Sequence, residues 1–300
     1  MKAIDLFAGA GGFSTGATMA GVQVVWAANH WPAAVQVHAN NHPTTQHVCQ
    51  DLQQADWSQV PGHDLLLASP ACQGHSRARG KERLHHDAMR STAWAVVDAA
   101  EVHKPAAFVV ENVSEFAKWV LYPAWCSAMG ALGYALSPMI LDAADHGVAQ
   151  HRRRLFIIGT RSKHPIQLDL PRRAHLGSAQ IIDFDAGRWS TVDGHVPATI
   201  SRITEGRKAH GQRFLTAYYG NESGGRSIDR PVGTITTRDR WAVIDGDRMR
   251  MLSVDECRKA MGFPAGYQLP SRSKDAVHML GNAVVPMVAC DVINALRAAA

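Results

Sequence analysis

The sequence has no apolar run long enough to cross a membrane and no pair of cysteines at metal-binding spacing. Its uninterrupted apolar stretches fall well short of the roughly 20 residues that a transmembrane helix needs. Five cysteines in 300 residues, widely spaced and without a CxxC, argue against a disulfide framework and a structural zinc site. The first residues do not read as a signal peptide. We therefore expect a soluble cytoplasmic protein that uses neither a membrane nor a metal.

Histidine is abundant, at 16 residues, and three of the histidines lie close together along the chain. His38, His42 and His47 have the donor atoms for a metal ion, but no second pair of ligands at a matching spacing accompanies them. We interpret them as solvated loop and helix residues.

Positive charge is concentrated in the middle of the chain. The net charge is +5, and residues 161–230 carry 11 Lys and Arg against 7 Asp and Glu. A basic module beside a balanced domain suits a polyanion such as nucleic acid. A generic basic surface is the alternative that the count leaves open.

Buried strands alternate with helices through the first 160 residues. The predicted helices span 91–104 and 122–133, and the predicted strands span 3–7, 22–28, 63–69, 106–112 and 153–160. This alternation predicts an α/β fold with a doubly wound, mostly parallel sheet.

The pattern changes after residue 160, where Pro, Gly and Arg interrupt short apolar pieces. Helical character returns at Ser253, a predicted N-cap with Glu256 three residues later in capping-box spacing. An apolar helix over 284–296 is predicted to return to the first domain. We expect one domain over 1–160 plus 276–300, and a smaller, irregular domain over 161–275.

A glycine-rich segment, IDLFAGAGGFSTG at 4–16, follows the first strand. Gly9, Gly11 and Gly12 permit a tight turn and the close approach of a ligand to the backbone. The segment lacks the Gly-Lys-Ser/Thr of a P-loop, and Ser14 stands where a GxGxxG motif needs its third glycine. The turn therefore predicts a nucleotide-like cofactor of another kind, with a plain tight turn as the alternative.

Polar residues follow the next strands. The second strand ends at Asn29, His30 and Trp31, where such folds commonly place a carboxylate for ribose hydroxyls. Asp51 follows the predicted third strand and could accept a hydrogen bond from an adenine amino group.

Two candidate catalytic groups follow apolar strands. Cys72 comes after LLLASPA in a predicted loop, where a thiolate would be a strong nucleophile. Glu111 ends AAFVV, where a desolvated carboxyl suits a general acid. An inert core cysteine and a helix N-cap acid are the alternatives. Both groups fall at strand ends that line the ligand crevice of an open α/β sheet.

Three arginines precede the strand LFIIG. In an extended strand Arg152 and Arg154 share one face and Arg153 takes the other. This spacing predicts two guanidinium groups aimed at the crevice, toward a phosphate or a base carbonyl. A surface run of salt bridges is the competing interpretation.

Taken together, these segments resemble the cytosine-5 DNA methyltransferase family. Six motifs occur in family order, namely DLFAGAGGFSTG, SPACQGHS, ENV, QHRRR, RPVGTITTRDR and GNAVVP. The resemblance covers most of the chain. It implies a class I methyltransferase fold with a target-recognition domain over 161–275, S-adenosylmethionine as the cofactor, and duplex DNA as the substrate.

The resemblance also implies a role for each matching residue. Cys72 would attack C6 of a flipped-out cytosine, Glu111 would act as the acid at N3, and Arg154 would contact the base carbonyl. Arg152 would support the loop. The implied cofactor residues are Phe7, Gly9, Gly11, Gly12, Asn29, His30, Trp31, Asp51, Pro70 and Asn282. The candidate DNA-binding residues are Gln73, Ser76, Arg202, Arg207, Arg213, Arg226 and Thr236, with Lys208 and Gln212 also available for base readout.

Two positions depart from the family pattern. Ala71 stands where the family has proline before the cysteine, and His30 stands where it has a ribose-binding glutamate. We expect weaker cofactor binding, or a modified donor with an extra acidic group. The leading interpretation is a monomeric DNA cytosine-5 methyltransferase, of the kind found in restriction–modification. Methylation of RNA cytosine and a catalytically weak DNA-binding protein are the alternatives.

Overall fold

The computed structural model describes residues 1–71, 92–218 and 224–299, which form two compact units. Unit 1 comprises Met1–Asp142, Arg153–Pro171 and Val284–Ala300, and unit 2 comprises Ala143–Arg152 and Arg172–Ala283. These boundaries differ from the expected ones. Residues 143–152 and 276–283 pack with unit 2, and 161–171 pack with unit 1. The assignment of DNA recognition to the second unit stays a prediction.

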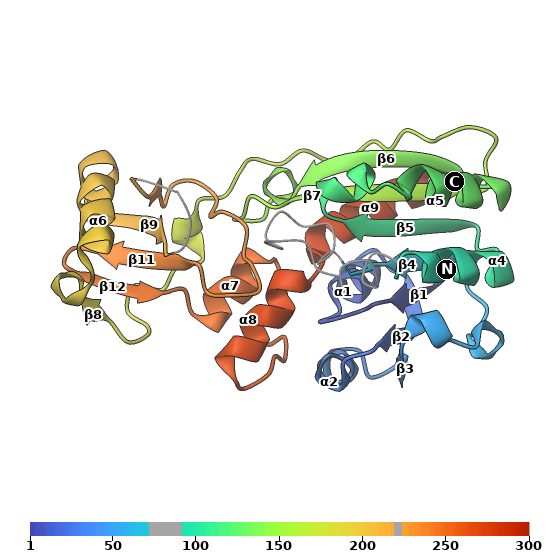
Figure 1. The fold of residues 1–300 in the computed structure, drawn as a ribbon, viewed down its shortest axis with the longest axis horizontal. Coiled ribbons are helices and arrows are strands. Elements are labelled where there is room, and N and C mark those ends of the chain that lie inside the picture. The colour runs from blue at the N-terminus through green and yellow to red at the C-terminus, as the bar shows by residue number, and fades with distance from the viewer. Residues whose placement is uncertain (72–91, 219–223, 300) are drawn as a thin grey trace. The chain divides into compact units, whose positions relative to one another are not determined.

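Unit 1 is built on a seven-stranded sheet in the order β3-β2-β1-β4-β5-β7-β6 (Figure 1). The strands are β1 (Lys2–Leu6), β2 (Gln23–Asn29), β3 (Gln46–Cys49), β4 (Leu65–Ala68), β5 (Ala107–Asn112), β6 (Ala135–Asp142) and β7 (Arg153–Thr160). The first five are parallel, and β7 runs antiparallel to both β5 and β6. The predicted doubly wound, mostly parallel sheet is confirmed. Its central strands read as continuous apolar runs because both faces are covered.

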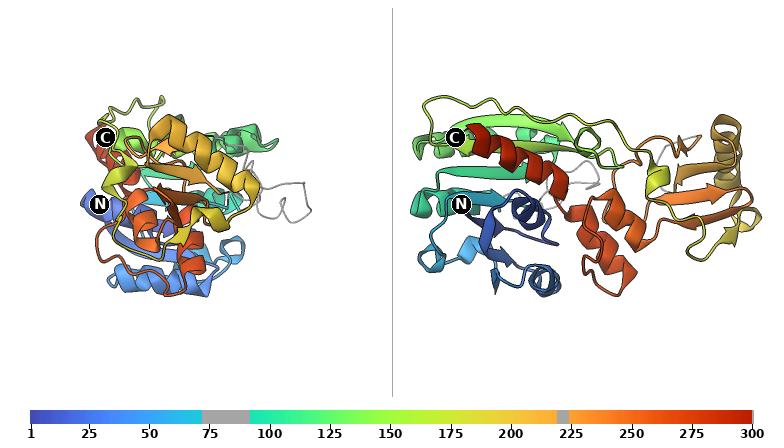
Figure 2. Two further views of the ribbon diagram at one scale, coloured as in Figure 1. Left: turned by 90° about the vertical axis from the view of Figure 1, so that its left-hand side faces the viewer. Right: turned by 180° about the vertical axis from the view of Figure 1, so that it is seen from behind.

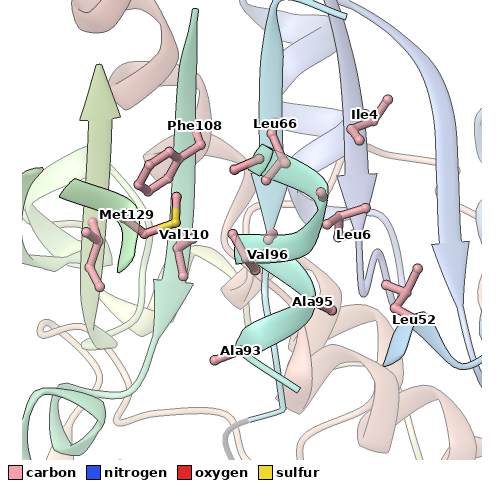
Figure 3. Packing of buried hydrophobic residues seen from close by; sticks show 14 of the residues in the cluster. Ile4, Leu6, Leu52, Leu66, Ala93, Ala95, Val96, Phe108, Val110 and Met129 are labelled. Atoms are coloured by element: carbon pink, nitrogen blue, oxygen red, sulfur yellow. The ribbon is translucent and has the colours of Figure 1, made fainter. Parts of the chain in front are cut away.

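Helices α4 (Trp94–His103) and α5 (Tyr122–Ala131) cover one face of this sheet. Figure 3 shows α4 lying across β4 and β5, with Val96 close to Leu66 and Val110. Phe108 of β5 contacts the ring of Trp125 edge-on. This layer is the main apolar core of the unit.

Helices α1 (Gly12–Met19), α2 (Pro32–Asn41) and α9 (Pro286–Ala299) belong to the opposite face. The view from behind in Figure 2 shows α9 crossing this side of the sheet. A Cβ on Gly16 of α1 would lie 2.5 Å from Ala289 Cβ, so glycine is what lets α1 and α9 pack this closely. The predicted C-terminal apolar helix is therefore present, and it packs on α1.

Unit 2 holds a five-stranded antiparallel sheet in the order β10-β9-β11-β12-β8. Helix α6 (Pro197–His210) covers one face through Ile203, which packs with Phe214 and Ile244. The strands are β8 (Ser190–Thr191), β9 (Arg213–Ala217), β10 (Arg226–Ser227), β11 (Trp241–Asp245) and β12 (Arg248–Met251). This unit contains more regular structure than its prolines and glycines suggest.

Two further helices complete unit 2, α7 (Val254–Ala260) and α8 (Ser273–Asn282). The predicted capping box is confirmed: Ser253 Oγ accepts from the Glu256 N–H, and the Glu256 carboxylate accepts from the Ser253 N–H. Short 3₁₀ turns occur at Leu52–Gln54, Trp57–Gln59, Ser114–Lys118, Ala143–His146, Ser178–Gln180 and Val192–Gly194.

One stretch, Ser273–Ala299, has the length and apolar composition of a membrane-spanning helix. However, 83% of its most apolar window is buried inside the molecule, as expected for core helices. The backbone also leaves the helical conformation at 283–285, between α8 and α9.

Candidate active site and cofactor pocket

Four neighbouring parallel strands of unit 1 end side by side and bring most of the predicted cofactor residues together. β1 pairs with β2 on one side and β4 on the other, and the strand order reverses there. Such a switch point opens a crevice outside the carboxyl ends of the strands. Phe7, Asn29, Asp51 and Pro70 lie at or just beyond these strand ends. Asn282, in contrast, belongs to unit 2, where it ends α8.

The glycine turn has an unusual backbone. Phe7, Gly9 and Gly11 have φ values of 60°, 54° and 85°, in the region that favours glycine. Among the described residues, a Cβ on Gly9 would meet only the Phe7 carbonyl oxygen, at 3.8 Å, which leaves room for a ligand above Gly9. Gly12 differs, because its Cβ would lie 2.0 Å from the Val284 carbonyl oxygen. Gly12 is therefore required by packing against the chain that enters α9.

The end of β2 offers Asn29 and His30 where such folds commonly place a carboxylate. Asn29 Oδ1 accepts from the Trp31 N–H at 2.9 Å, which orients the chain entering α2. His30 is exposed. Asp51 is exposed too, and its Oδ1 accepts from the Gln53 N–H at 3.0 Å. An aromatic ring, an available carboxylate and an open glycine turn together fit a nucleoside-bearing cofactor.

Glu111 at the end of β5 is buried and paired with an arginine. Its Oε1 lies 3.2 Å from Arg154 Nε at the start of β7, and the two strands are adjacent. The next residue, Asn112, donates from Nδ2 to the Pro70 carbonyl oxygen at 3.0 Å. This bond ties the strand of Glu111 to the segment that leads toward Cys72. Cys72, Gln73 and Ser76 themselves lie outside the described residues.

Ala71 is held by a residue that sequence reasoning missed. Its backbone N–H donates to Thr92 Oγ1 at 3.2 Å. A proline at this position would have no N–H to donate. No functional signal in the sequence marks Thr92, which falls inside the predicted helix over 91–104 and lies two residues before α4 in the structure.

Arg152 and Arg154 have different partners, and the prediction that both guanidinium groups aim at the crevice is wrong for Arg152. The Arg152 side chain is buried in unit 2 and donates to the carbonyl oxygens of Ile235, Gly281 and Ala283 at 3.1, 3.0 and 2.9 Å. It therefore joins the segments RPVGTITTRDR and GNAVVP.

Gln150 reinforces the same region of unit 2. Its Oε1 accepts from the Ile235 N–H at 2.7 Å, and its Nε2 donates to the Ala260 carbonyl oxygen at 2.9 Å. Thr236, which follows, donates its hydroxyl to the Arg238 carbonyl oxygen. Three motifs that are far apart in the sequence thus form one hydrogen-bonded group.

The four candidate DNA-binding arginines in unit 2 all have partners within the unit. Arg202 donates to the Ala217 carbonyl oxygen, and Arg207 donates to the Gly246 carbonyl oxygen, both at 2.7 Å. Arg213 pairs with Asp245 at 2.8 Å and lies over the Phe184 ring. Arg226 lies over the Trp241 ring. Arg248, not singled out from the sequence, pairs with Asp245 as well. A role in DNA binding stays a prediction for each of them.

The interpretation of His38, His42 and His47 as solvated residues is wrong for His38, whereas His42 and His47 are half-buried. His38 is 1% exposed, and its ring contacts the rings of both other histidines. The chain folds β3 back beside α2, which brings these residues together. Within the described residues, no group of three or more His, Cys, Asp or Glu side chains has a geometry suited to a metal ion.

Comparison with known proteins identifies one family along nearly the full length of the chain. The family model of C-5 cytosine-specific DNA methylases matches residues 1–298. Similar relatives include the Type II methyltransferase M.NlaX of Neisseria lactamica, 26% identical over 99% of this chain and 96% of the relative. Another is M.HgiDI of Herpetosiphon aurantiacus, 29% identical over 99% of this chain and 94% of the relative.

Among solved structures, DNMT2 of Spodoptera frugiperda has a similar fold, with a TM-score of 0.73. It is 18% identical, and the match covers 99% of both chains. The chain therefore belongs to the C-5 cytosine-specific DNA methylase family and is a DNA cytosine-5 methyltransferase.

Proposed function

We propose that this chain methylates C5 of a cytosine flipped out of a short, specific duplex DNA sequence, through a covalent bond between Cys72 and C6. S-adenosylmethionine is the proposed donor. The observation that carries the proposal is the contact between Asn112 and Pro70. It links the strand that carries Glu111 to the segment leading into Cys72.

The residue types follow from the chemistry of the ring. C5 of cytosine is a weak nucleophile until the Cys72 thiolate adds to C6 and breaks the aromaticity. Glu111 donates a proton or hydrogen bond to N3 and stabilises the charge that develops there. Arg154, 3.2 Å from Glu111, orients this carboxyl and has further donors for the base carbonyl.

When bound, S-adenosylmethionine supplies the methyl group. Phe7 and Trp31 would pack against its adenine, Asp51 would accept from the adenine amino group, and Gly9 and Gly11 would permit its close approach. Loss of the C5 proton then lets the C6–S bond break, which restores the ring and frees the thiolate. Attack at C6 is perpendicular to the ring, so the base must leave the stack at a cost of a few kcal/mol.

Unit 2 would offset the cost of base flipping by contacts with DNA. We propose that its arginines bind phosphates and base edges, with Arg207 and Arg213 the first to test. The curated relatives carry Type II names, and we propose a restriction–modification role for this chain in the cytoplasm. We also propose that it acts as a monomer.

Duplex DNA containing 5-fluorocytosine tests the covalent step. After methyl transfer, C5 then carries fluorine in place of the proton that must leave, so the Cys72–C6 bond persists. We expect a DNA-linked species on a denaturing gel that requires S-adenosylmethionine and is missing in Cys72→Ala. A linked species of equal yield in Cys72→Ala would refute the assignment of the nucleophile.

A further inference from the structure

A chain of four polar side chains lies beneath the glycine turn of unit 1. Ser14 Oγ lies 2.7 Å from Asp5 Oδ2, and His38 Nε2 lies 2.9 Å from Ser14 Oγ. His47 Nε2 lies 2.8 Å from His38 Nδ1. Asp5 belongs to β1, Ser14 to α1, His38 to α2 and His47 to β3. The chain therefore connects four elements and has an ionisable group at each end.

This chain holds the start of α1 in place. The Ser14 backbone N–H also donates to Asp5 Oδ2, at 3.1 Å, and Ser14 lies in the first turn of the helix that follows Gly11. His38 and His47 line a small hollow together with Gly9 and Asn29. The same side chains thus support the glycine turn and the end of β2, both of which belong to the predicted cofactor pocket.

The chain is fully hydrogen-bonded when it holds one ionisable proton, and two arrangements achieve this. In the first, His47 is protonated and donates to His38 Nδ1, His38 Nε2–H donates to Ser14 Oγ, and the Ser14 hydroxyl donates to ionised Asp5. In the second, protonated Asp5 donates to Ser14, the Ser14 hydroxyl donates to His38 Nε2, and His38 Nδ1–H donates to neutral His47. Both arrangements contain the same number of protons.

Adding or removing one proton leaves one hydrogen bond unmade. When Asp5 and His47 are both protonated, either Ser14 Oγ faces two donors and its own hydroxyl loses its acceptor, or Asp5 carries its proton on Oδ1, which has no partner among the described residues. When both are deprotonated, His47 Nε2 can still donate to His38, but its Nδ1 then carries no proton. The hydrogen bond to the Thr45 backbone, which favours protonated His47, is lost in that state.

Burial sets which end of the chain holds the proton near neutral pH. Asp5 is fully buried, and its Oδ1 has no hydrogen-bond partner among the described residues. Burial raises the pKa of Asp5 to about 7 and lowers the pKa of His38 and His47. His42, at the C-cap of α2, also packs on the chain, with its Nε2 3.3 Å from Thr15 Oγ1. Burial lowers the pKa of His42 to about 4, so it stays neutral near pH 7.

We propose that Asp5, Ser14, His38 and His47 form a proton-sharing relay that positions the glycine turn, so that S-adenosylmethionine binds most tightly when the relay holds one proton. This inference rests on the proposed use of that cofactor. The four side chains are positioning residues. They act through the turn and through the end of β2.

Calorimetric titration of S-adenosylmethionine between about pH 5 and pH 9 tests the relay. For the unsubstituted protein we expect affinity to peak near neutrality and to fall about threefold or more on each side, as the loss of one hydrogen bond implies. In His47→Gln, the amide can either donate to His38 or accept from it, so the alkaline fall disappears. In His47→Leu, His38 Nδ1 has no partner and affinity is lower throughout.

His63→Gln is the matched control. His63 belongs to the same unit and is half-buried, and its ring centroid lies 4.8 Å from that of His103. It lies outside the relay. Its variant should keep the pH profile of the unsubstituted protein. An identical profile in His47→Gln, or affinity that does not change with pH in the unsubstituted protein, would overturn the proposal.

A second measurement does not depend on the cofactor. Imidazole ¹⁵N shifts of the ligand-free protein report the protonated nitrogen of each ring, and we expect His38 and His47 to change together as the pH passes through about 7. Rings that titrate independently, or a His38 that stays in one tautomer, would reject the relay. If S-adenosylmethionine does not bind at any pH, the proposed function fails, and the shifts alone decide the relay.

Discussion

The backbone N–H of Ala71 donates to Thr92 Oγ1 at 3.2 Å, across the two ends of the segment that contains Cys72. We predict that Thr92→Val lowers the single-turnover methylation rate about 2- to 10-fold, because one hydrogen bond that orients Ala71 is lost. Thr92→Ser should keep the rate. Adding Ala71→Pro to Thr92→Val should restore it, because proline has no N–H to satisfy and fixes φ. Rates that fall equally in the valine and serine variants would contradict this role.

Arg152 is predicted to stabilise unit 2 and Arg153 is not. Arg152→Met leaves three carbonyl oxygens without a donor, which should lower the free energy of unfolding by about 3 kcal/mol or more. Arg153 is exposed, so Arg153→Met should change stability by less than about 0.5 kcal/mol. Urea unfolding of both variants is the measurement. Equal stability of the two would show that Arg152 has no such role.

Asp5 should make stability depend on pH. Its native pKa is about 7, against 3.8 for an unperturbed carboxyl, so the native state binds more protons than the unfolded state between these values. The stabilisation is complete below about pH 4 and is lost as the pH rises to about 7, a difference on the order of 4 kcal/mol. The lowered pKa values of the histidines act in the opposite direction, so Asp5→Asn is compared with the unsubstituted protein at each pH. The stability of Asp5→Asn relative to the unsubstituted protein should therefore rise from pH 4 to pH 7. A constant difference would contradict the raised pKa.

His30 is predicted to limit cofactor affinity. It is exposed at the end of β2, where a carboxylate would bind ribose hydroxyls. His30→Glu should tighten the binding of S-adenosylmethionine about fivefold or more, since hydrogen bonds to charged groups contribute about 1.5–3 kcal/mol. The two hypotheses for His30 are weaker binding of S-adenosylmethionine and use of a donor with an extra acidic group. Calorimetry with S-adenosylmethionine and with a carboxylate-bearing donor separates them. Unchanged affinity in His30→Glu for both donors would reject both.

The sequence was sufficient to predict the elements whose stability is local or strongly apolar. The strand over 106–112, the capping box at Ser253 and the apolar C-terminal helix can be predicted without knowledge of their packing, because periodicity and caps are encoded within a few residues. The six motifs, read in order, also predicted the family.

Long-range contacts could not be predicted in this way. His38 and His47 are nine residues apart, and only the fold of β3 beside α2 makes them hydrogen-bonded partners. Arg152 and Arg154 differ in their partners because the carbonyl groups that bind Arg152 come from residues 235, 281 and 283, more than 80 residues away along the chain. Gly12 fits a ligand-binding motif, but its lack of a side chain is required by Val284, far along the chain. Such requirements become visible only when distant segments are packed.

The proposed reaction forms 5-methylcytosine in duplex DNA with Cys72 as the nucleophile and Glu111 as the acid. Mass spectrometry of nucleosides tests it directly, after mixed-sequence duplex DNA is incubated with the protein and S-adenosylmethionine. We predict 5-methylcytosine with the unsubstituted protein, none with Cys72→Ala, and a rate lower by about 10²-fold or more with Glu111→Gln. The account would be contradicted by methylation that survives Cys72→Ala, or by a folded protein that modifies cytosine only in RNA.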